Sequence, residues 1–144
     1  SEADKILISG DQVLPRISSI VSVHPTEAYE NPLEEWIASC RRIRDELPEG
    51  TFVLPAHNEP FYGLHTRMTQ LIDEHEENLV KLHDMLDEPR RAIDVFPALF
   101  KRKITADVFF MATGESLAHL RCLIGRGLAT VERDENGVDW YRRS

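Results

Sequence analysis

Two short apolar runs along the chain predict strands, and a polar side chain follows each of them directly. The run from Lys5 to Ile8 is apolar and β-branched, and Ser9-Gly10-Asp11 interrupts it. The run from Thr51 to Leu54 is stopped by a proline, and His57 comes two residues later. We therefore expect an aspartate and a histidine just beyond the ends of two strands.

Apolar residues at spacings of three and four predict two long helices. Asn31-Pro32 has the composition of a helix start, with Asn as N-cap and Pro at the first helical position. That helix continues to Leu47, before Pro48 and Gly50. A second helix begins at Leu64 and keeps its apolar spacing for more than twenty residues, ending before Pro89.

The order strand, helix, strand predicts an α/β arrangement in which the two strands are parallel. Parallel strands end at the same edge of a sheet, and ligands of open α/β sheets bind outside the carboxyl ends of the strands. Asp11 and His57 are thus expected at one edge. Carboxylate and imidazole are good ligands for zinc and similar metals. The alternative is that Asp11 only closes a Gly-Asp turn and His57 only ends a loop.

The remaining segments predict a long loop and a winged-helix-like tail. Residues 13–30 keep no period and read as a loop, with a short extended piece at Ile20–Val23. The tail predicts two short helices, a third helix opened by Thr113-Gly114-Glu115, and a hairpin turned at Asn136-Gly137. The helices are expected at Ala92–Phe100, at Thr105–Ala112 and from Thr113 to Gly125, and the strands at Ala129–Glu132 and Val138–Tyr141.

Composition indicates an ordinary globular chain of 144 residues, with 42% hydrophobic and 29% charged residues. No apolar run approaches the roughly 20 residues of a membrane span. The acidic start Ser1-Glu2-Ala3-Asp4 does not resemble a signal peptide, so we expect a cytoplasmic protein with no membrane partner. Cys40 and Cys122 have no CxxC spacing, which favours buried free thiols.

Charge is unevenly distributed between the two parts of the chain. The net charge is −8, but residues 1–88 hold 7 basic against 18 acidic residues, whereas residues 89–144 hold 10 against 7. A basic winged helix could bind DNA. However, the helix that would enter the groove begins with Glu115 and offers only Arg121 and Arg126, and the hairpin tip at 134–136 is acidic. We therefore expect no nucleic-acid partner.

Two segments carry a resemblance to the metallo-β-lactamase superfamily. "ILISGDQVLPRIS" resembles its strand-Gly-Asp segment, and "TFVLPAHNEPFYGLHTRMTQLIDEHEENL" is similar to its strand-Pro-Gly-His segment and the long helix after it. "TGESLAHLRCLIGRGLATVERDENGVDWYRR" resembles the winged-helix-like extension of some members, including the β-lactamase-like protein 2 group. The resemblance implies that Asp11 bridges two zinc ions and that His57 completes the second site. Ala56 and Asn58 stand where glycines are usual.

One signature of that superfamily, His-X-His-X-Asp-His, is absent from the six histidines of this chain. The resemblance then implies a C-terminal portion whose partner is the missing N-terminal half. The fold class is α/β, a partial αββα half-sandwich followed by a mainly α winged-helix-like subdomain. The domain limits are 1–63 for the lactamase-like part, 64–88 for a connecting helix, and 89–144 for the winged-helix-like subdomain.

The implied function is metal-dependent hydrolysis of an ester, thioester, lactam or phosphodiester by the complete protein. This chain alone has too few ligands and is expected to be inactive. Tyr62 and His65 are candidates for the pocket of a small-molecule substrate, although a surface or helix-capping role suits His65 equally. Apolar surface left uncovered predicts self-association. The competing class is a non-enzymatic winged-helix module that binds protein or DNA.

Overall fold

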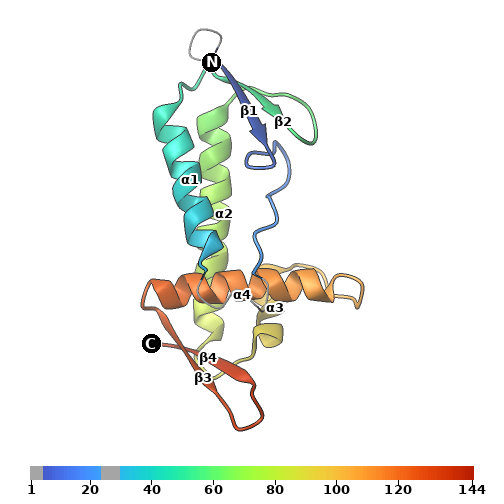
Figure 1. Ribbon diagram of the computed structural model, residues 1–144, viewed down its shortest axis with the longest axis vertical. Helices are drawn as coiled ribbons and strands as arrows, with labels where there is room; N and C mark the ends of the chain where they lie inside the picture. Colours follow the sequence, from blue (N-terminus) through green and yellow to red (C-terminus); the bar gives the residue numbers. More distant parts are fainter. Residues whose placement is uncertain (1–4, 24–29) are drawn as a thin grey trace. The chain divides into compact units, whose positions relative to one another are not determined.

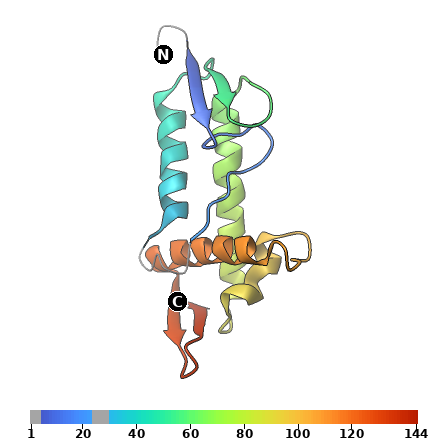
Figure 2. The ribbon, with the colours of Figure 1, turned by 45° about the vertical axis from the view of Figure 1, so that its right-hand side comes forward.

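The first two strands pair in parallel, as predicted. In the computed structural model, which describes residues 5–23 and 30–144, β1 (Ile6–Gly10) and β2 (Phe52–Pro55) form a two-stranded sheet. Ile6 pairs with Phe52 and Gly10 with Pro55, and the register is irregular just before Gly10. Figures 1 and 2 show the two strands side by side and running in the same direction. Their carboxyl ends therefore lie at one edge.

Both long helices form where the apolar spacing predicts them. Helix α1 spans Pro32–Glu46, and the side chain of Asn31 accepts a hydrogen bond from the Glu34 amide at 3.4 Å, which confirms the predicted N-cap. Helix α2 spans Leu64–Met85 and follows Gly63, whose φ of 91° lies in the left-handed region.

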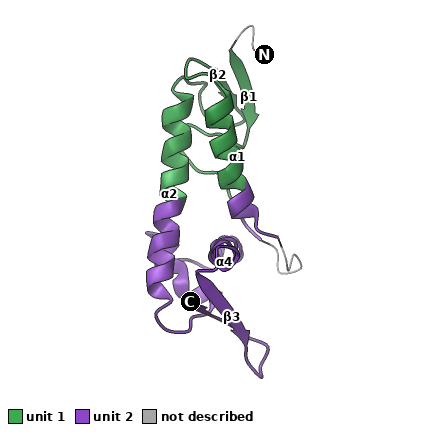
Figure 3. Ribbon diagram, turned by 90° about the vertical axis from the view of Figure 1, so that its left-hand side faces the viewer, with its two compact units in different colours: residues 1–20, 36–75 green, residues 21–35, 76–144 purple. Residues whose placement is uncertain are grey.

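The described residues group into two compact units, drawn in different colours in Figure 3. Unit 1 takes its residues from 1–20 and 36–75, and unit 2 from 21–35 and 76–144. Helices α1 and α2 each contribute to both units. These units interleave along the chain, whereas the domain limits expected from the sequence follow chain order. Those domain limits stay a prediction.

Each unit has its own set of buried apolar side chains. In unit 1 these come from the loop after β1, from α1, from β2 and from α2, and they include Val13, Leu14, Ile37, Cys40, Val53, Leu64, Met68 and Leu71. In unit 2 they include Leu33, Leu79, Leu82, Leu86, Val95, Ala118, Leu120, Leu123 and Tyr141. The inward positions on the helices are those that the three-four spacing predicts.

The helices of the tail are divided differently from the prediction. A 3₁₀ helix, η1 (Ala92–Val95), leads directly into the short α3 (Phe96–Leu99), where one helix was expected. The break expected between Ala112 and Thr113 is wrong, because a single α4 spans Phe109–Gly125, and residues 105–108 are not helical; the helix end at Gly125 is as predicted.

Thr113 and Gly114 lie inside α4 for reasons that local pattern does not reveal. The Thr113 hydroxyl donates to the Phe109 carbonyl at 2.8 Å, four residues back along the helix, instead of capping a new one. Gly114 makes room for a neighbouring segment: its carbonyl accepts from the Val23 amide at 3.1 Å, and an added Cβ would lie 2.9 Å from that of Ser22. The glycine therefore marks a close approach of two segments.

The terminal hairpin forms as predicted, with each strand one residue longer and the second strand starting one residue later. Strands β3 (Ala129–Arg133) and β4 (Asp139–Arg143) pair antiparallel. Gly137 has φ 78°, and the Asp134 side chain accepts hydrogen bonds from the Asn136 and Val138 amides and from the Trp140 indole. The winged-helix assignment of this tail stays a prediction.

The segment between β1 and α1 is irregular, as predicted, across the residues described before position 24. Ile20–Val23 forms no strand there, so the expected extended piece is not part of a sheet. Residues 24–29, including His24, lie outside the described residues. Within 5–23 and 30–144, no helix is long and apolar enough to cross a membrane.

Cys40 and Cys122 are free and buried, which confirms the prediction from their spacing. Burial raises the pKa of the Cys40 thiol to about 11, and a hydrogen bond from Gln12 partly opposes that rise. Burial also raises the pKa of Cys122 to about 12, and its hydrogen bond to Glu34 acts in the same direction. Both thiols stay protonated near neutral pH and are poor nucleophiles or metal ligands.

Candidate functional site

Asp11 and His57 lie side by side just beyond the ends of β1 and β2. The His57 Nε2 atom is 3.3 Å from the Asp11 Oδ1 atom, and both side chains are 68% exposed. The two residues are 46 positions apart in the sequence, and the parallel register of the strands brings them together. The structure therefore places both at one rim, while their metal-binding role stays a prediction.

Local backbone geometry explains how the His57 loop forms without the expected glycines. Asn58 has φ 69°, a left-handed conformation that asparagine tolerates better than most residues, so it can replace a glycine there. Ala56 does not have a positive φ and donates its amide to the Gly10 carbonyl at 2.9 Å. This bond joins the two strand ends immediately before His57.

Hydrogen bonds from neighbouring elements fix the loop that carries Asp11. The Ser9 hydroxyl donates to the Val13 carbonyl at 3.0 Å, which closes the turn around Asp11. Further along, Arg67 of α2 donates to the carbonyls of Leu14 and Ile17 at 2.6 and 3.0 Å. Burial lowers the pKa of Arg67, and the nearby Glu74 opposes that shift. Helix α2 therefore holds this loop through the loop's backbone carbonyls.

An exposed ion pair links the two loops. Arg16, from the loop after β1, lies 2.7 Å from the Glu59 carboxylate, two residues after His57. Both side chains are largely solvated, so the pair contributes little to stability. Its significance is positional, because it spans the same two loops as Asp11 and His57.

The spacing of the two donor atoms fits one edge of a zinc coordination sphere. Two ligands at the usual zinc distance of about 2.1 Å, in tetrahedral geometry, lie about 3.4 Å apart. The separation of Asp11 Oδ1 and His57 Nε2 is close to this value. Among the residues that the structure describes, however, no group of three or more His, Cys, Asp or Glu could hold a metal ion. Asp11 and His57 can therefore form part of a zinc site but not a complete one.

His65 makes contacts that favour the structural alternative left open by the sequence. Its Nε2 atom is 2.6 Å from the Leu47 carbonyl, and its Nδ1 atom is 3.2 Å from the Glu49 carboxylate. Glu49 also accepts the backbone amide of His65 at 3.0 Å, near the start of α2. These bonds tie the start of α2 to the connection between α1 and β2.

Tyr62 is 68% exposed, and its ring lies 4.7 Å from that of Phe52 at a tilt of 36°. The side chains of Tyr62 and His65 therefore have different partners. A role for either residue in a substrate pocket stays a prediction.

Two other described histidines, His75 and His119, have packing roles. His75 is 7% exposed, bonds to Ser18 at 2.9 Å and meets the Trp36 ring edge-on. His119 is 2% exposed, and its Nδ1 atom lies 2.8 Å from the Glu115 carbonyl one turn back in α4.

Arg126, a candidate for DNA contact on its sequence, instead pairs with two acidic side chains. The Arg126 guanidinium makes bonds of 2.7 and 3.2 Å to Glu34 and of 2.7 and 3.0 Å to Glu76. These bonds raise the pKa of Arg126 further above its usual range. The Gly-Arg-Gly sequence marks a helix end, but nothing in it identifies acidic partners 50 and 92 residues away.

Comparison with known proteins places this architecture among metallo-β-lactamase-like proteins. Residues 79–144 match the family model described as "Metallo-beta-lactamase-like, C-terminal domain". The predicted resemblance to the metallo-β-lactamase superfamily is thereby confirmed, whereas the winged-helix-like character of the tail stays a prediction. The proteins of this family are usually zinc-binding hydrolases. A comparison with curated proteins gave no match.

Two solved structures show the similarity over the whole chain. The chain is 39% identical to a beta-lactamase domain protein from Burkholderia ambifaria, with a TM-score of 0.94 over 100% of its residues. It is 28% identical to a metallo-beta-lactamase family protein from Thermus thermophilus, with a TM-score of 0.78 over 99% of its residues. The chain spans 43% of the length of each of these two proteins.

Proposed function

We propose that this chain is the C-terminal portion of a metal-dependent hydrolase and supplies two metal ligands, Asp11 and His57. The observation that carries the proposal is the 3.3 Å separation of their donor atoms at the rim where two parallel strands end. In the complete protein, the remaining ligands would come from the N-terminal half. The chain alone would neither hold zinc tightly nor turn over substrate.

In such a site, Asp11 would bridge two ions through its carboxylate and His57 would hold the second through Nε2. Bound zinc lowers the pKa of a water ligand and polarises a carbonyl or phosphoryl oxygen, which serves hydrolysis of esters, thioesters, lactams or phosphodiesters. The loop after β1, held by Arg67, and the loop that contains Asn58 would keep the two side chains in place. Their high exposure leaves room for ligands from the other half and for a small-molecule substrate.

Metal analysis of the full-length protein tests this proposal. Asp11→Ala and His57→Ala should each lower the bound zinc per protein, by about half or more, because a bridging or terminal ligand is lost. Asp73→Ala and His83→Ala are the matched controls, since these residues lie on α2. Undiminished zinc content and activity in both Asp11 and His57 variants would refute the proposal.

The substrate-pocket proposal for His65 and Tyr62 needs a separate measurement. If they line the pocket, His65→Ala and Tyr62→Ala should raise KM several-fold while leaving zinc content unchanged. An unchanged KM in a folded variant would assign His65 to the helix start alone, where its bonds to Leu47 and Glu49 lie.

A further inference from the structure

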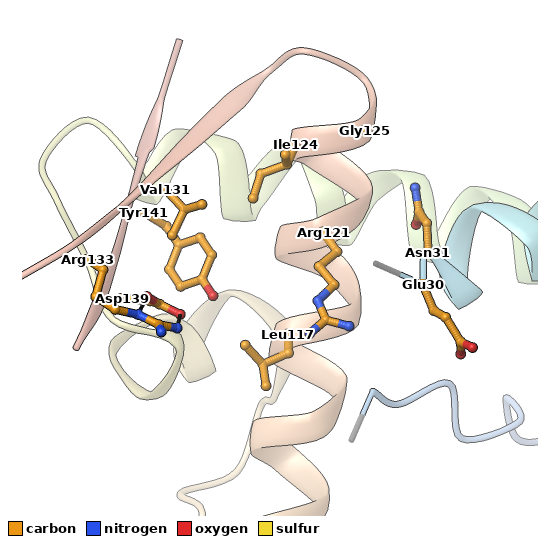
Figure 4. A pocket seen from close by; sticks show the side chains of 10 residues that line it. All are labelled: Glu30, Asn31, Leu117, Arg121, Ile124, Gly125, Val131, Arg133, Asp139 and Tyr141. Carbon is orange, nitrogen blue, oxygen red and sulfur yellow. Dashed lines mark hydrogen bonds and ion pairs between the residues drawn. The ribbon is translucent and has the colours of Figure 1, made fainter. Parts of the chain in front are cut away.

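The two ends of α4 have different surroundings. Leu117 and Ile124 line a cavity of about 630 Å³, and Figure 4 shows the β3–β4 hairpin on the opposite side of it. The first three residues of the helix lie in solvent to a large extent: Phe109, Phe110 and Met111 are 45%, 68% and 39% exposed. Three large apolar side chains in a row are therefore partly solvated where the helix begins.

The directions of these three side chains restrict what could cover them. Successive residues of an α-helix point about 100° apart, so three in a row span more than half of its circumference. The Phe109 ring meets that of Phe96 edge-on at 5.7 Å, and much of its surface is still exposed. A flat and rigid partner would contact only one side of such a helix start, whereas a soft apolar layer entered end-on could cover all three side chains.

The segment just before α4 carries positive charge that no described residue offsets. Lys101, Arg102 and Lys103 are consecutive and exposed, and their side chains make no hydrogen bond or ion pair within the part of the chain that the structure describes. Residues 101–111 together hold three basic residues against one acidic residue. Exposed apolar side chains and uncompensated cations thus lie within one short segment.

An apolar cavity of about 480 Å³ connects these two features. The three basic residues line it together with Phe96 and Phe100, and the Phe96 ring also contacts that of Phe109. Asp94 lines the cavity too, but its carboxylate already accepts two bonds from Arg91, at 2.8 and 2.9 Å. The basic-aromatic surface around this cavity is defined by Lys101, Arg102, Lys103, Phe109, Phe110 and Met111.

We propose that the basic-aromatic surface binds the headgroup region of an anionic phospholipid membrane. Its cations would contact lipid phosphates, and Phe110 and Met111 would enter the boundary between headgroups and acyl chains. Cations close to an anionic bilayer favour binding, and aromatic side chains favour this boundary. The proposal departs from the expectation of no membrane partner, because binding at a membrane surface needs no segment that spans it.

A single-stranded nucleic acid would also match the positive charge, but it fits the apolar side chains less well. Such strands stack their bases on the faces of aromatic rings. Met111 offers no ring face, and the Phe109 ring is already in contact with Phe96. The basic-aromatic surface lies wholly in unit 2, so the proposal does not rest on the metal ligands proposed in unit 1.

Sedimentation of the full-length protein with vesicles tests the proposal. Vesicles of phosphatidylcholine with about a quarter of phosphatidylserine should bind the protein at low salt, and vesicles of phosphatidylcholine alone should bind it about tenfold more weakly. Raised salt should release the protein, because it screens the attraction between charges. No binding to the anionic vesicles at low salt, or equal binding to both kinds, would overturn the proposal. Coverage of this surface by the N-terminal half would give the first of these results.

Charge removal tests the contribution of the cations. Replacing two of them together, Lys101→Gln with Lys103→Gln, should weaken binding about 25-fold, because each cation near an anionic surface contributes about fivefold. The matched control is Arg142→Gln with Arg143→Gln, since these two arginines are exposed in the same unit but lie outside the basic-aromatic surface. An equal loss in both double variants would assign the binding to overall charge and contradict the proposal.

Phe110 tests the apolar contribution. Phe110→Ser removes a ring that is 68% exposed and should weaken vesicle binding about tenfold. Val80→Ser is the control, because Val80 is 62% exposed on α2 in the same unit and should bind as the wild type does. Circular dichroism confirms that each variant is folded. Vesicle binding that Phe110→Ser leaves unchanged would refute the proposal, and so would binding of a single-stranded oligonucleotide in place of vesicles.

Discussion

The two sheets of this chain differ in how well residues of the same unit cover and anchor them. The β1–β2 sheet is parallel and two-stranded, and it leaves Ile6 and Ile8 38% and 79% exposed. The β3–β4 sheet is an antiparallel hairpin whose turn is organised by Asp134 and whose strand β4 bonds back to Arg90. Local contacts organise the turn and pairing of the second sheet, in which Val131 is 43% exposed, whereas Ile8 of the first sheet lies mostly in solvent.

This difference follows from the physics of the two sheet types. Parallel sheets in known folds are larger and covered on both faces, whereas an antiparallel hairpin can have one face in solvent. The candidate metal site shows the same contrast, because Asp11 and His57 provide two ligands and a zinc centre needs about three from protein. We propose that the N-terminal half completes both the sheet and the site.

The largest effect on stability is expected at Arg126, whose ion pairs lie entirely within unit 2. Arg126→Gln should lower the free energy of unfolding by about 2 kcal/mol, because Glu34 and Glu76 would be left close together without their shared cation. Urea unfolding followed by circular dichroism measures the loss.

Arg133→Gln provides the control for that measurement. Arg133 makes a similar two-bond contact with Asp139 but is exposed, so its unfolding midpoint should hardly change. Equal destabilisation of the two variants would mean that burial does not set the strength of these ion pairs.

A smaller and pH-dependent effect is expected at the hairpin turn. The hydrogen bond from Trp140, together with those from the Val138 and Asn136 amides, lowers the pKa of Asp134 below the ordinary value of 3.8. Because the folded pKa is the lower one, this contribution is present above pH 3.8 and is lost as pH falls through the folded pKa. NMR titration of the Trp140 indole proton should report this transition.

Asp134→Asn should abolish the transition, since the amide side chain does not titrate. Glu135→Gln, one residue along the same turn, should preserve it. A Trp140 titration that is unchanged in the Asp134 variant would assign the low pKa to another group.

The smallest effect on stability is expected at Ile8. Because this residue is 79% exposed on the two-stranded β1–β2 sheet, its replacement is expected to change self-association instead. Ile8→Thr keeps a β-branched side chain and should change the free energy of unfolding by less than about 0.5 kcal/mol. If the exposed face of β1 mediates self-association, sedimentation should show a larger monomer fraction. Ile17→Thr, an exposed isoleucine outside the sheet, should not alter it.

The elements with regular patterns were predictable from the sequence. Three-four spacing located both long helices, Asn31-Pro32 located the start of α1, and the parallel pairing that follows from a strand-helix-strand order brought Asp11 beside His57. These features depend on neighbours in sequence or on a topological rule, so no knowledge of the packed structure is needed.

The features that were missed depend on contacts between distant segments. Gly114 was expected to open a helix, but the approach of Ser22 and Val23 explains it without any helix break. The sequence allowed either a substrate-pocket role or a structural role for His65, and its contacts with Leu47 and Glu49 favour the structural one. The alternation along β3 and β4 could have indicated that Val131 and Tyr141 share a face, but not that α4 lies opposite.

The two buried cysteines give each unit its own chemical reporter. Cys40 lies in unit 1 and Cys122 in unit 2, and an alkylating reagent reacts only with an exposed thiolate. Their labelling rates under native conditions would thus measure how often each unit opens. If the N-terminal half stabilises unit 1, its addition should slow labelling of Cys40 more than that of Cys122. The chain can therefore report which of its units lacks a partner without any introduced label.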